Sequence, residues 1–307
     1  MLPAAALRWV EDVTGSAVAT AVAMPGATSS QVVALTFVGG RELVLRLHTK
    51  LEWLAAEPDV AIREANALQA LSGSDVVAPA LVAVDPDGGF CGQPAVLMTR
   101  LRGNADLSDV SPARLRSLAV AVRDLHRLSA PQSLPAYRPY VRADERAVPT
   151  WTTAHGAWLT AFEICDLPAP AGPAALIHRD YHPGNVLVDD GVITGIVDWP
   201  NACAGPPEID IAHCRVNLAV THGLAAADAF ATDAATDPRR QAYWDVVDCV
   251  DLLDEELAAA RVGRSADSEA AIAALTAMGA SGLTLALVHR RLDEYIVDAT
   301  GRFSSAT

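Results

Sequence analysis

One segment near the middle of the chain, residues 177–199, constrains the fold more than any other. After Ile-His-Arg-Asp-Tyr-His-Pro-Gly-Asn come an apolar run, the turn Asp-Asp-Gly, and a second apolar run that ends in Asp198-Trp. Two such runs joined by Asp-Asp-Gly predict a hairpin, with Gly191 supplying the positive φ. Asp180 and Asn185 lie at the entrance of this hairpin and Asp198 at its exit. The three polar side chains are therefore expected to converge.

These residue types suit phosphoryl transfer, in which catalysis is mostly positioning and charge neutralisation. Asp180 can accept the proton of an attacking hydroxyl, while Asn185 and Asp198 offer oxygen ligands for Mg²⁺. Two other interpretations stay open. His178 and His182 with Asp180 suggest a transition-metal site, although Pro183 argues against the continuous helix that a zincin motif needs. Polar loop residues can also serve only as turn caps.

The segment resembles the catalytic loop and metal-binding hairpin of the aminoglycoside phosphotransferase and choline kinase-like family. These small-molecule kinases share the protein-kinase fold, and their pattern is His-x-Asp-x-x-x-x-Asn followed by a strand ending in Ile/Val-Asp-Trp. Residues 205–212 resemble the family's Gly-Asp-Pro-x-x-Asp-Leu-Ala motif, with Pro206 in place of the usual Asp and Asp210 retained. The resemblance implies that Asp180 is catalytic and that His178 orders the loop.

The resemblance also implies an α+β, bilobal, protein-kinase-like fold. Residues 1–98 would form a nucleotide-binding lobe with an antiparallel sheet and one helix, and apolar runs at 81–84 and 95–98 predict two of its five strands. Residues 99–103 would be the hinge, and residues 104–307 a mainly helical catalytic and substrate-binding lobe. Backbone groups of the hinge, at Arg100 and Leu101, are expected to pair with the purine of the nucleotide. Backbone recognition of this kind does not separate ATP from GTP.

The first strands supply the rest of the expected nucleotide site. Apolar runs at 16–24, 31–38 and 43–48 predict a three-stranded meander. Its first turn, residues 25–30, contains Ser29 and Ser30, whose backbone N–H groups could approach phosphates. An ordinary hairpin loop explains the same residues equally well.

Arg46 is the cation on the third strand, where the family carries a basic residue that contacts phosphate. Glu64 lies on the apolar stripe of a helix predicted to start after Asp59, a good N-cap residue. A carboxylate on such a stripe needs a partner, because an unpaired buried charge is costly. We expect Arg46 to be that partner; a local contact with Arg63 or a solvent-facing position remains the alternative.

The last third of the chain has a helical pattern. Residues 241–260 alternate Asp and Glu with Val and Leu, which predicts an amphipathic helix with an acidic outer surface. In the family, helices of this region form the wall of the acceptor pocket, and acidic groups there bind amines. A solvated surface is the simpler interpretation.

Composition favours a cytoplasmic enzyme. The 307 residues are 51% hydrophobic, but no apolar run approaches the length of a membrane span. Five cysteines without CxxC spacing imply neither a disulfide framework nor a zinc ribbon. The net charge of −14 argues against nucleic acid as a partner and suggests a cationic or neutral small molecule as the acceptor.

The expected activity is transfer of the γ-phosphoryl group of ATP or GTP to a hydroxyl of a small molecule, with Mg²⁺. An antibiotic is the leading acceptor, which would make the protein a resistance enzyme. A metabolic kinase of a sugar or amino alcohol is the alternative, and a non-catalytic nucleotide-binding regulator is a third. A protein kinase is disfavoured, because Trp-Pro-Asn follows Asp198 instead of Phe-Gly.

Overall fold

The computed structural model describes residues 2–24, 30–253 and 266–306. They form two compact units, each assembled from separate stretches of chain. The first unit contains the chain up to Gly103 together with Pro131–Leu134 and Thr194–Ala202. The second contains Asn104–Ala130, Pro135–Ile193 and the chain from Cys203 onward. Each unit is described by itself, and the lobe boundaries and the hinge predicted above stay a prediction.

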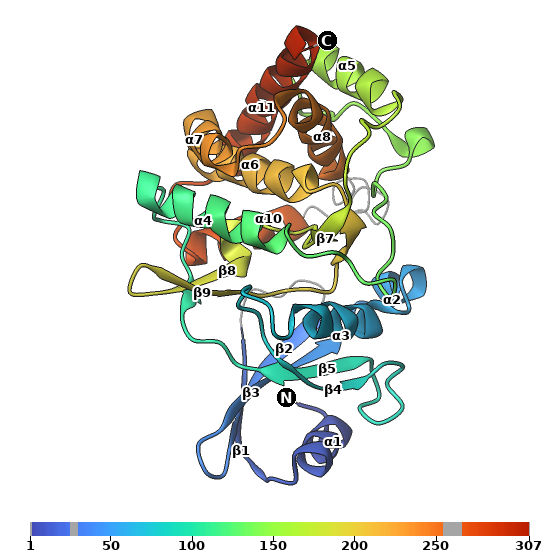
Figure 1. The fold of residues 1–307 in the computed structure, drawn as a ribbon, viewed down its shortest axis with the longest axis vertical. Helices are drawn as coiled ribbons and strands as arrows, with labels where there is room; N and C mark the ends of the chain where they lie inside the picture. Colours follow the sequence, from blue (N-terminus) through green and yellow to red (C-terminus); the bar gives the residue numbers. More distant parts are fainter. Residues whose placement is uncertain (1, 25–29, 254–265, 307) are drawn as a thin grey trace. The chain divides into compact units, whose positions relative to one another are not determined.

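A five-stranded antiparallel sheet forms the centre of the first unit, as the sequence predicts (Figure 1). Its spatial order is β1-β2-β3-β5-β4. The strands are β1 (Val18–Ala23), β2 (Ser30–Phe37), β3 (Glu42–His48), β4 (Leu81–Asp85) and β5 (Ala95–Thr99). The central strand β3 pairs with β2 on one side and β5 on the other, so Arg46 lies opposite Val32 and Val96.

Alternation along β3 sends its side chains to two different environments. Leu43, Leu45 and Leu47 are fully buried in a cluster with residues of helix α1 (Ala4–Thr14). Arg46 and His48 have the opposite parity and meet Glu64 of helix α3 (Val60–Leu71). The sheet thus separates an apolar core from a charged cluster.

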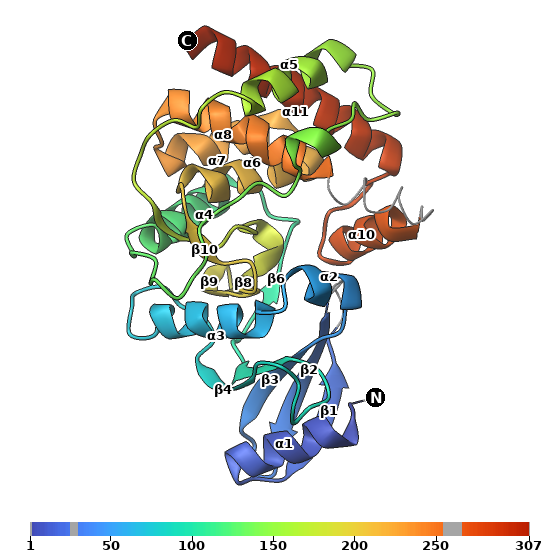
Figure 2. The same ribbon diagram turned by 90° about the vertical axis from the view of Figure 1, so that its right-hand side faces the viewer.

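The expectation of one helix in this part of the chain was wrong. Helix α1 and the short α2 (Leu51–Ala56) accompany α3. Helix α1 forms because Ala6, Trp9 and Val10 make one apolar face that covers the sheet (Figure 2).

Asp59 is the N-cap residue of α3, as predicted, but its side chain makes no capping hydrogen bond. Its backbone carbonyl accepts from Arg63 N at 2.9 Å, which begins the helix.

The second unit is mainly helical, as predicted. Ser111 caps the first helix, α4 (Pro112–Leu125), by accepting from Arg114 N at 3.3 Å. The later helices include α6, which begins within the 205–212 motif, and its neighbour α8. Their bounds are α5 (His155–Cys165), α6 (Glu208–His222), α7 (Leu224–Ala234), α8 (Pro238–Asp251), α10 (Ala266–Ala277) and α11 (Leu285–Ala306).

Short strands frame the loop of residues 178–185. Strand β7 (Ala175–Ile177) enters the loop and pairs with β10 (Cys203–Gly205), while β8 (Val186–Asp189) leaves it and pairs with β6 (Asn104–Ala105). The predicted hairpin joins β8 to β9 (Val192–Ile196). Its turn has positive φ at both Asp190 (49°) and Gly191 (77°), the pattern of a type I′ turn. A single 3₁₀ turn, Pro183–Asn185, is the only helical structure between Asp180 and Asn185.

The acidic face predicted for residues 241–260 was wrong where the structure describes it. Asp245, Asp248 and Asp251 of α8 are buried, with at most 9% exposed. Helix α8 packs against α5, α6 and α11, which leaves little of its surface to solvent. Asp254, Glu255 and Glu256 lie outside the described residues.

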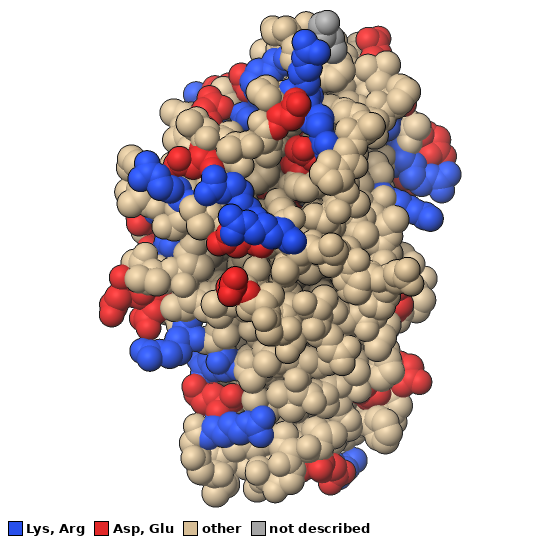
Figure 3. Space-filling view, in the orientation of Figure 1, with Lys and Arg blue, Asp and Glu red and all other residues tan. Residues whose placement is uncertain are grey.

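Charge is mixed on one face of the molecule (Figure 3). On this face, Lys and Arg side chains lie beside Asp and Glu side chains instead of forming one basic patch. Among the described residues, no helix is both long and apolar enough to span a bilayer.

The hydrogen bonds of Asp293, in α11, give a prediction about the stability of the second unit. Its buried carboxylate accepts from Trp158 Nε1 of α5 at 3.0 Å, from Thr153 N at 2.8 Å, and from the hydroxyls of Thr152 and Thr153. Asp293→Ala should lower the unfolding free energy by about 3 kcal/mol, because these donors lose their acceptor. Glu294→Ala, next to it and exposed, should change it by less than about 0.5 kcal/mol. Equal denaturation midpoints would contradict this assignment.

Candidate active site

The loop between β7 and β8 holds Asp180 in a network of donors. Asn185 Nδ2 donates to Asp180 Oδ2 at 3.0 Å and to its backbone carbonyl at 2.9 Å. His213 Nε2 lies 3.0 Å from Asp180 Oδ1, and His182 Nε2 lies 3.7 Å from the same oxygen. The Asp180 side chain is 31% exposed. Both carboxylate oxygens are thus oriented, while part of the group still faces solvent.

Asp210 fixes the backbone of this loop. Its Oδ2 accepts from His178 N at 2.9 Å and its Oδ1 from Arg179 N at 2.6 Å. His126 Nε2 lies 2.9 Å from the same Oδ2, so this histidine is a satisfied packing residue. The contacts explain how Arg179 keeps a φ of 67°, a conformation that costs a non-glycine residue roughly 1–3 kcal/mol.

His178 lies inside the loop that it was expected to order. It is fully buried, and its Nδ1 accepts from Asp180 N at 3.3 Å. Its ring also packs edge-on against Tyr181, with 6.4 Å between the centroids. These contacts suit a residue that positions the loop and does not touch the reacting atoms.

The pKa values of the groups in this loop determine which of them are charged at neutral pH. Burial would raise the pKa of Asp180, but the hydrogen bond from His213 and the nearby histidines lower it well below its usual range. Burial together with the neighbouring histidines lowers the pKa of His182 to about 4, against the pull of Asp180. At neutral pH, Asp180 is therefore ionised and His182 is neutral.

A second polar cluster lies in the first unit. Arg46 Nε forms an ion pair with Glu64 Oε1 at 3.1 Å, and Arg46 NH1 forms one with Asp198 Oδ1 at 3.0 Å. Ser30 Oγ accepts from Arg46 NH1 at 3.1 Å. His48 Nε2 lies 3.5 Å from Glu64 Oε2. The structure therefore contains the predicted strand-to-helix ion pair and brings Ser30 and Asp198 to the same guanidinium.

Burial governs this cluster, since the Arg46 side chain is 8% exposed and that of Glu64 is 1% exposed. Burial opposes ionisation of both groups, yet Asp198 and Glu64 raise the pKa of Arg46, and Arg46 with His48 lowers the pKa of Glu64. Both stay charged. Arg63, the alternative partner for Glu64, instead pairs with Glu57 and donates to Pro200 O.

Asp198 follows the hairpin in a special conformation. Its φ is 72°, and its side chain remains 36% exposed beside the buried Arg46. The next residue, Trp199, is fully buried and donates from Nε1 to Ile196 O at 2.9 Å. The indole thus fixes the turn that presents Asp198.

Oxygen donors for a magnesium ion are present at both predicted positions. Asn185 uses its amide nitrogen for both bonds to Asp180, which leaves its carbonyl oxygen for a cation. Asp198 presents a partly exposed carboxylate. These groups fit the hard oxygen ligands that Mg²⁺ prefers. No cluster of three or more His, Cys, Asp or Glu side chains in the described ranges is arranged to hold a metal ion.

The remaining predicted residues lie at the end of the first unit. Arg100 NH1 pairs with Glu42 at 2.8 Å on the surface, so its side chain is engaged away from the cluster. Leu101 packs tightly against Gly195: a Cβ atom added at Gly195 would lie only 2.4 Å from Leu101 Cδ1. Ser29 lies outside the described residues. Purine contact by the backbone at 100–101 stays a prediction.

Sequence reasoning missed His48, His213 and Asp248. His213 follows Asp210 by three residues, so one face of α6 presents both toward the loop. That spacing was a usable signal. Asp248 carried none, because an acidic residue on an amphipathic helix has the same pattern whether it is solvated or paired.

The acids of α8 all have partners. Asp248 Oδ1 lies 3.3 Å from His213 Nδ1, and Asp245 pairs with Arg215 and Arg302. Asp251 accepts from Tyr140 N at 3.0 Å, from Val141 N at 3.1 Å and from Tyr137 Oη at 3.3 Å. Each of these carboxylates is thus paired within the second unit, and a role for them in binding the acceptor stays a prediction.

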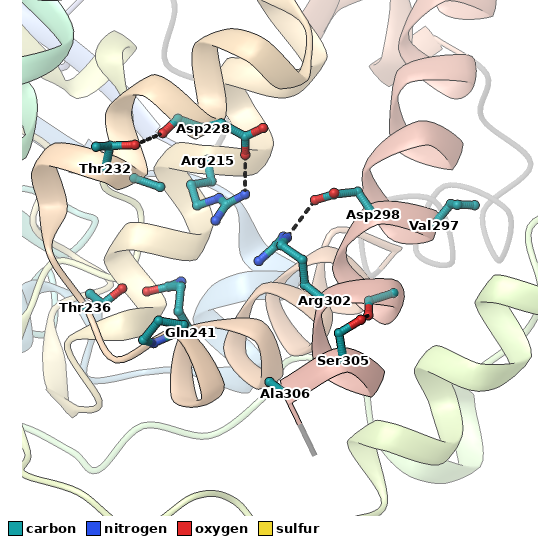
Figure 4. Close-up of a pocket in the computed structure, with 13 residues that line it drawn as sticks. Arg215, Asp228, Thr232, Thr236, Gln241, Val297, Asp298, Arg302, Ser305 and Ala306 are labelled. Carbon is teal, nitrogen blue, oxygen red and sulfur yellow. Dashed lines mark hydrogen bonds and ion pairs between the residues drawn. The ribbon is translucent and has the colours of Figure 1, made fainter.

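A cavity of about 700 Å³ lies at one side of α6, α8 and α11. Its arginines are neutralised, since Arg215 pairs with Asp228 at 2.9 Å and Arg302 with Asp298 at 2.7 Å (Figure 4). None of the predicted site residues lines it. A smaller cavity of about 220 Å³ is bordered by Tyr137, Trp244 and Asp251.

Asp251 gives a prediction on pH dependence. Burial raises its pKa to about 7, against the backbone N–H groups of Val141 and Tyr140. In the unfolded chain the pKa is about 3.9. Between these values the folded state keeps a proton that the unfolded state has lost, so stability falls as pH rises from about 4 to about 7.

Asp251→Asn cannot titrate and should lack this loss. Denaturant unfolding of both proteins at several pH values measures the effect. The titration of groups that both proteins share cancels when one free energy of unfolding is subtracted from the other. The variant should gain stability relative to the wild type as pH rises through this window. A difference that is constant with pH would show that the pKa of Asp251 is not raised.

Comparison with known proteins agrees with this geometry. The profile of the "Phosphotransferase enzyme family" matches residues 20–248. A homoserine kinase from Beijerinckia indica is 32% identical over 139 residues, a stretch that covers 41% of this chain and 42% of that protein. The chain thus matches less than half the length of this relative.

Solved structures share the fold. A thermostable mutant of aminoglycoside phosphotransferase APH(4)-Ia, in a ternary complex with ADP and hygromycin B, aligns with a TM-score of 0.59 and 17% identity, over 91% of this chain and 99% of that one. Macrolide 2'-phosphotransferase MphH from Brachybacterium faecium aligns with a TM-score of 0.59 and 21% identity, over 87% and 96%. With the family profile covering residues 20–248, this chain belongs to the phosphotransferase enzyme family.

Proposed function

We propose that this protein transfers the γ-phosphoryl group of ATP to a hydroxyl of a small molecule. The observation that carries the proposal is the Asp180 carboxylate, which is ionised, partly exposed and oriented through both oxygens. A group with these properties suits the residue that orients a hydroxyl and accepts its proton.

In the chemical step, the acceptor oxygen attacks the γ-phosphorus while its proton passes to Asp180. A new P–O bond forms, the bond between the γ-phosphorus and its bridging oxygen breaks, and ADP leaves. Positioning is the main demand on the protein, because the transferring group carries most of its charge on its own oxygens.

Arg46 serves the nucleotide in this proposal. Its guanidinium is a planar fork that can hold two phosphate oxygens, unlike the point charge of a lysine. Glu64 fixes it from one side through the 3.1 Å ion pair. Asn185 and Asp198 would hold Mg²⁺, which neutralises phosphate charge when bound.

ATP is our preferred donor over GTP. The APH(4)-Ia complex named above contains ADP, which supports an adenine nucleotide for a protein of the same fold. Backbone contacts at 100–101 would pair with the purine. The composition supports a cytoplasmic location.

For the acceptor we propose an antibiotic hydroxyl first, because the structural neighbours include aminoglycoside and macrolide phosphotransferases. An amino-alcohol metabolite is the second candidate, favoured by the match to a homoserine kinase. The pairing of Asp245, Asp248 and Asp251 removes one argument for a strongly cationic acceptor. A nucleotide-binding regulator would retain the polar cluster around Arg46 but would not need an oriented Asp180.

Mass spectrometry of an acceptor panel tests the proposal. Aminoglycosides, macrolides, amino alcohols and sugars are incubated with the protein, Mg²⁺ and ATP or GTP. We expect a phosphate adduct on one class, and Asp180→Asn should reduce its rate by about 10²–10⁴-fold, the usual contribution of a positioned base. Asp190→Asn, in the exposed hairpin turn, is the matched control and should transfer at the wild-type rate. Unchanged transfer by a folded Asp180→Asn protein would refute the role of Asp180.

A further inference from the structure

His213 connects the catalytic loop to the helical core of the second unit. Its Nε2 lies 3.0 Å from Asp180 Oδ1, and its Nδ1 lies 3.3 Å from Asp248 Oδ1. The three side chains come from the loop, from α6 and from α8. One imidazole therefore bridges two carboxylates.

Burial makes this bridge rigid. The His213 side chain is 14% exposed and that of Asp248 is 7% exposed. Helices α6 and α8 pack closely along their length, which fixes the distance between them. The imidazole has only two rotatable bonds, so contacts at both ring nitrogens determine its orientation.

We propose that His213 is a positioning residue for phosphoryl transfer: bridging Asp248 and Asp180 through its two ring nitrogens, it holds Asp180 Oδ1 in place for the acceptor hydroxyl. This inference rests on the proposed function of Asp180. A carboxylate offers about four lone-pair sites, and His213 and Asn185 use one on each oxygen. The bound carboxylate thus retains sites for the hydroxyl that it must deprotonate.

The charge of the imidazole follows from its neighbours. Burial disfavours a charged ring, but Asp248 and Asp180 outweigh it and raise the pKa of His213 well above its usual range. His182, with its ring centroid 5.8 Å away, is neutral at pH 7 because its own pKa is lowered. Among the described residues, Asp180 and His182 of the loop and Asp248 of α8 are the titratable groups that act on the ring.

The first test is kinetic. In His213→Gln the amide can donate to Asp180 but carries no charge and cannot bridge both carboxylates. We expect kcat to fall by about 10²-fold, the effect of misplacing a catalytic group by about 1 Å, with KM for ATP unchanged. Asp248→Asn should lower kcat in the same direction. The control is His222→Gln at the end of the same helix, where the histidine bonds to Leu107 O at 2.7 Å; its kcat should equal that of the wild type.

The second test does not depend on activity. Histidine ¹⁵N NMR of the wild-type protein, with the signal of His213 identified by its absence in His213→Gln or His213→Asn, follows ring protonation against pH. We expect a doubly protonated ring at pH 7.5 and a lower pKa in both Asp248→Asn and Asp180→Asn. A neutral ring at pH 7.5, or a pKa that neither variant changes, would overturn the proposal even if the enzyme transfers phosphate.

The two tests separate this inference from the proposed function. If Asp180→Asn abolishes transfer while His213→Gln and Asp248→Asn keep the wild-type kcat, only the role of His213 is wrong. If the wild-type protein transfers no phosphate to any acceptor, the proposed function fails, and the NMR titration still decides whether His213 bridges the two carboxylates as a cation.

Discussion

The hydrogen bonds of Asp210 are the constraint on which the 178–185 loop of the second unit depends. Its carboxylate accepts two consecutive backbone N–H groups, at His178 and Arg179, and so sustains a positive φ that an arginine would otherwise avoid. Asp180 follows directly, and its position is determined by this backbone. The carboxylate is itself buried in the first turn of α6, so the geometry of the loop is tied to the start of that helix.

The same electrostatic rule organises both clusters. A buried charge is tolerated only when opposite charges and hydrogen bonds compensate its lost hydration. Glu64 meets this requirement through Arg46 and His48, and Asp180 meets it through His213 and Asn185. Each cluster leaves one partly exposed carboxylate, Asp198 in the first unit and Asp180 in the second. These are the groups that the proposed mechanism uses.

Local patterns predicted the five-stranded sheet, the hairpin and the Arg46–Glu64 pair, because strand alternation and one helical stripe contain the needed information. Prediction failed where the answer depends on distant packing. The sequence pattern around Asp248 is that of a solvated residue. Its partner His213 is 35 positions away in sequence, and the two meet only because α6 packs against α8. Helix α1 was missed because its apolar face is short and gains its meaning only from the leucines of β3. Asp59 has the right residue type for a cap but not the geometry.

In this proposal, Arg46 and Glu64 bind ATP, whereas Asp180 acts on the acceptor hydroxyl and contributes little to ATP binding. Calorimetric titration of ATP with Mg²⁺ tests these separate roles most directly. Glu64→Gln should weaken ATP binding by about tenfold, equivalent to about 1.4 kcal/mol, because Arg46 loses the charge that orients it. Asp180→Asn should bind ATP like the wild type, as should the exposed control Glu52→Gln. Wild-type affinity in Glu64→Gln, or an equal loss in Asp180→Asn, would contradict the account.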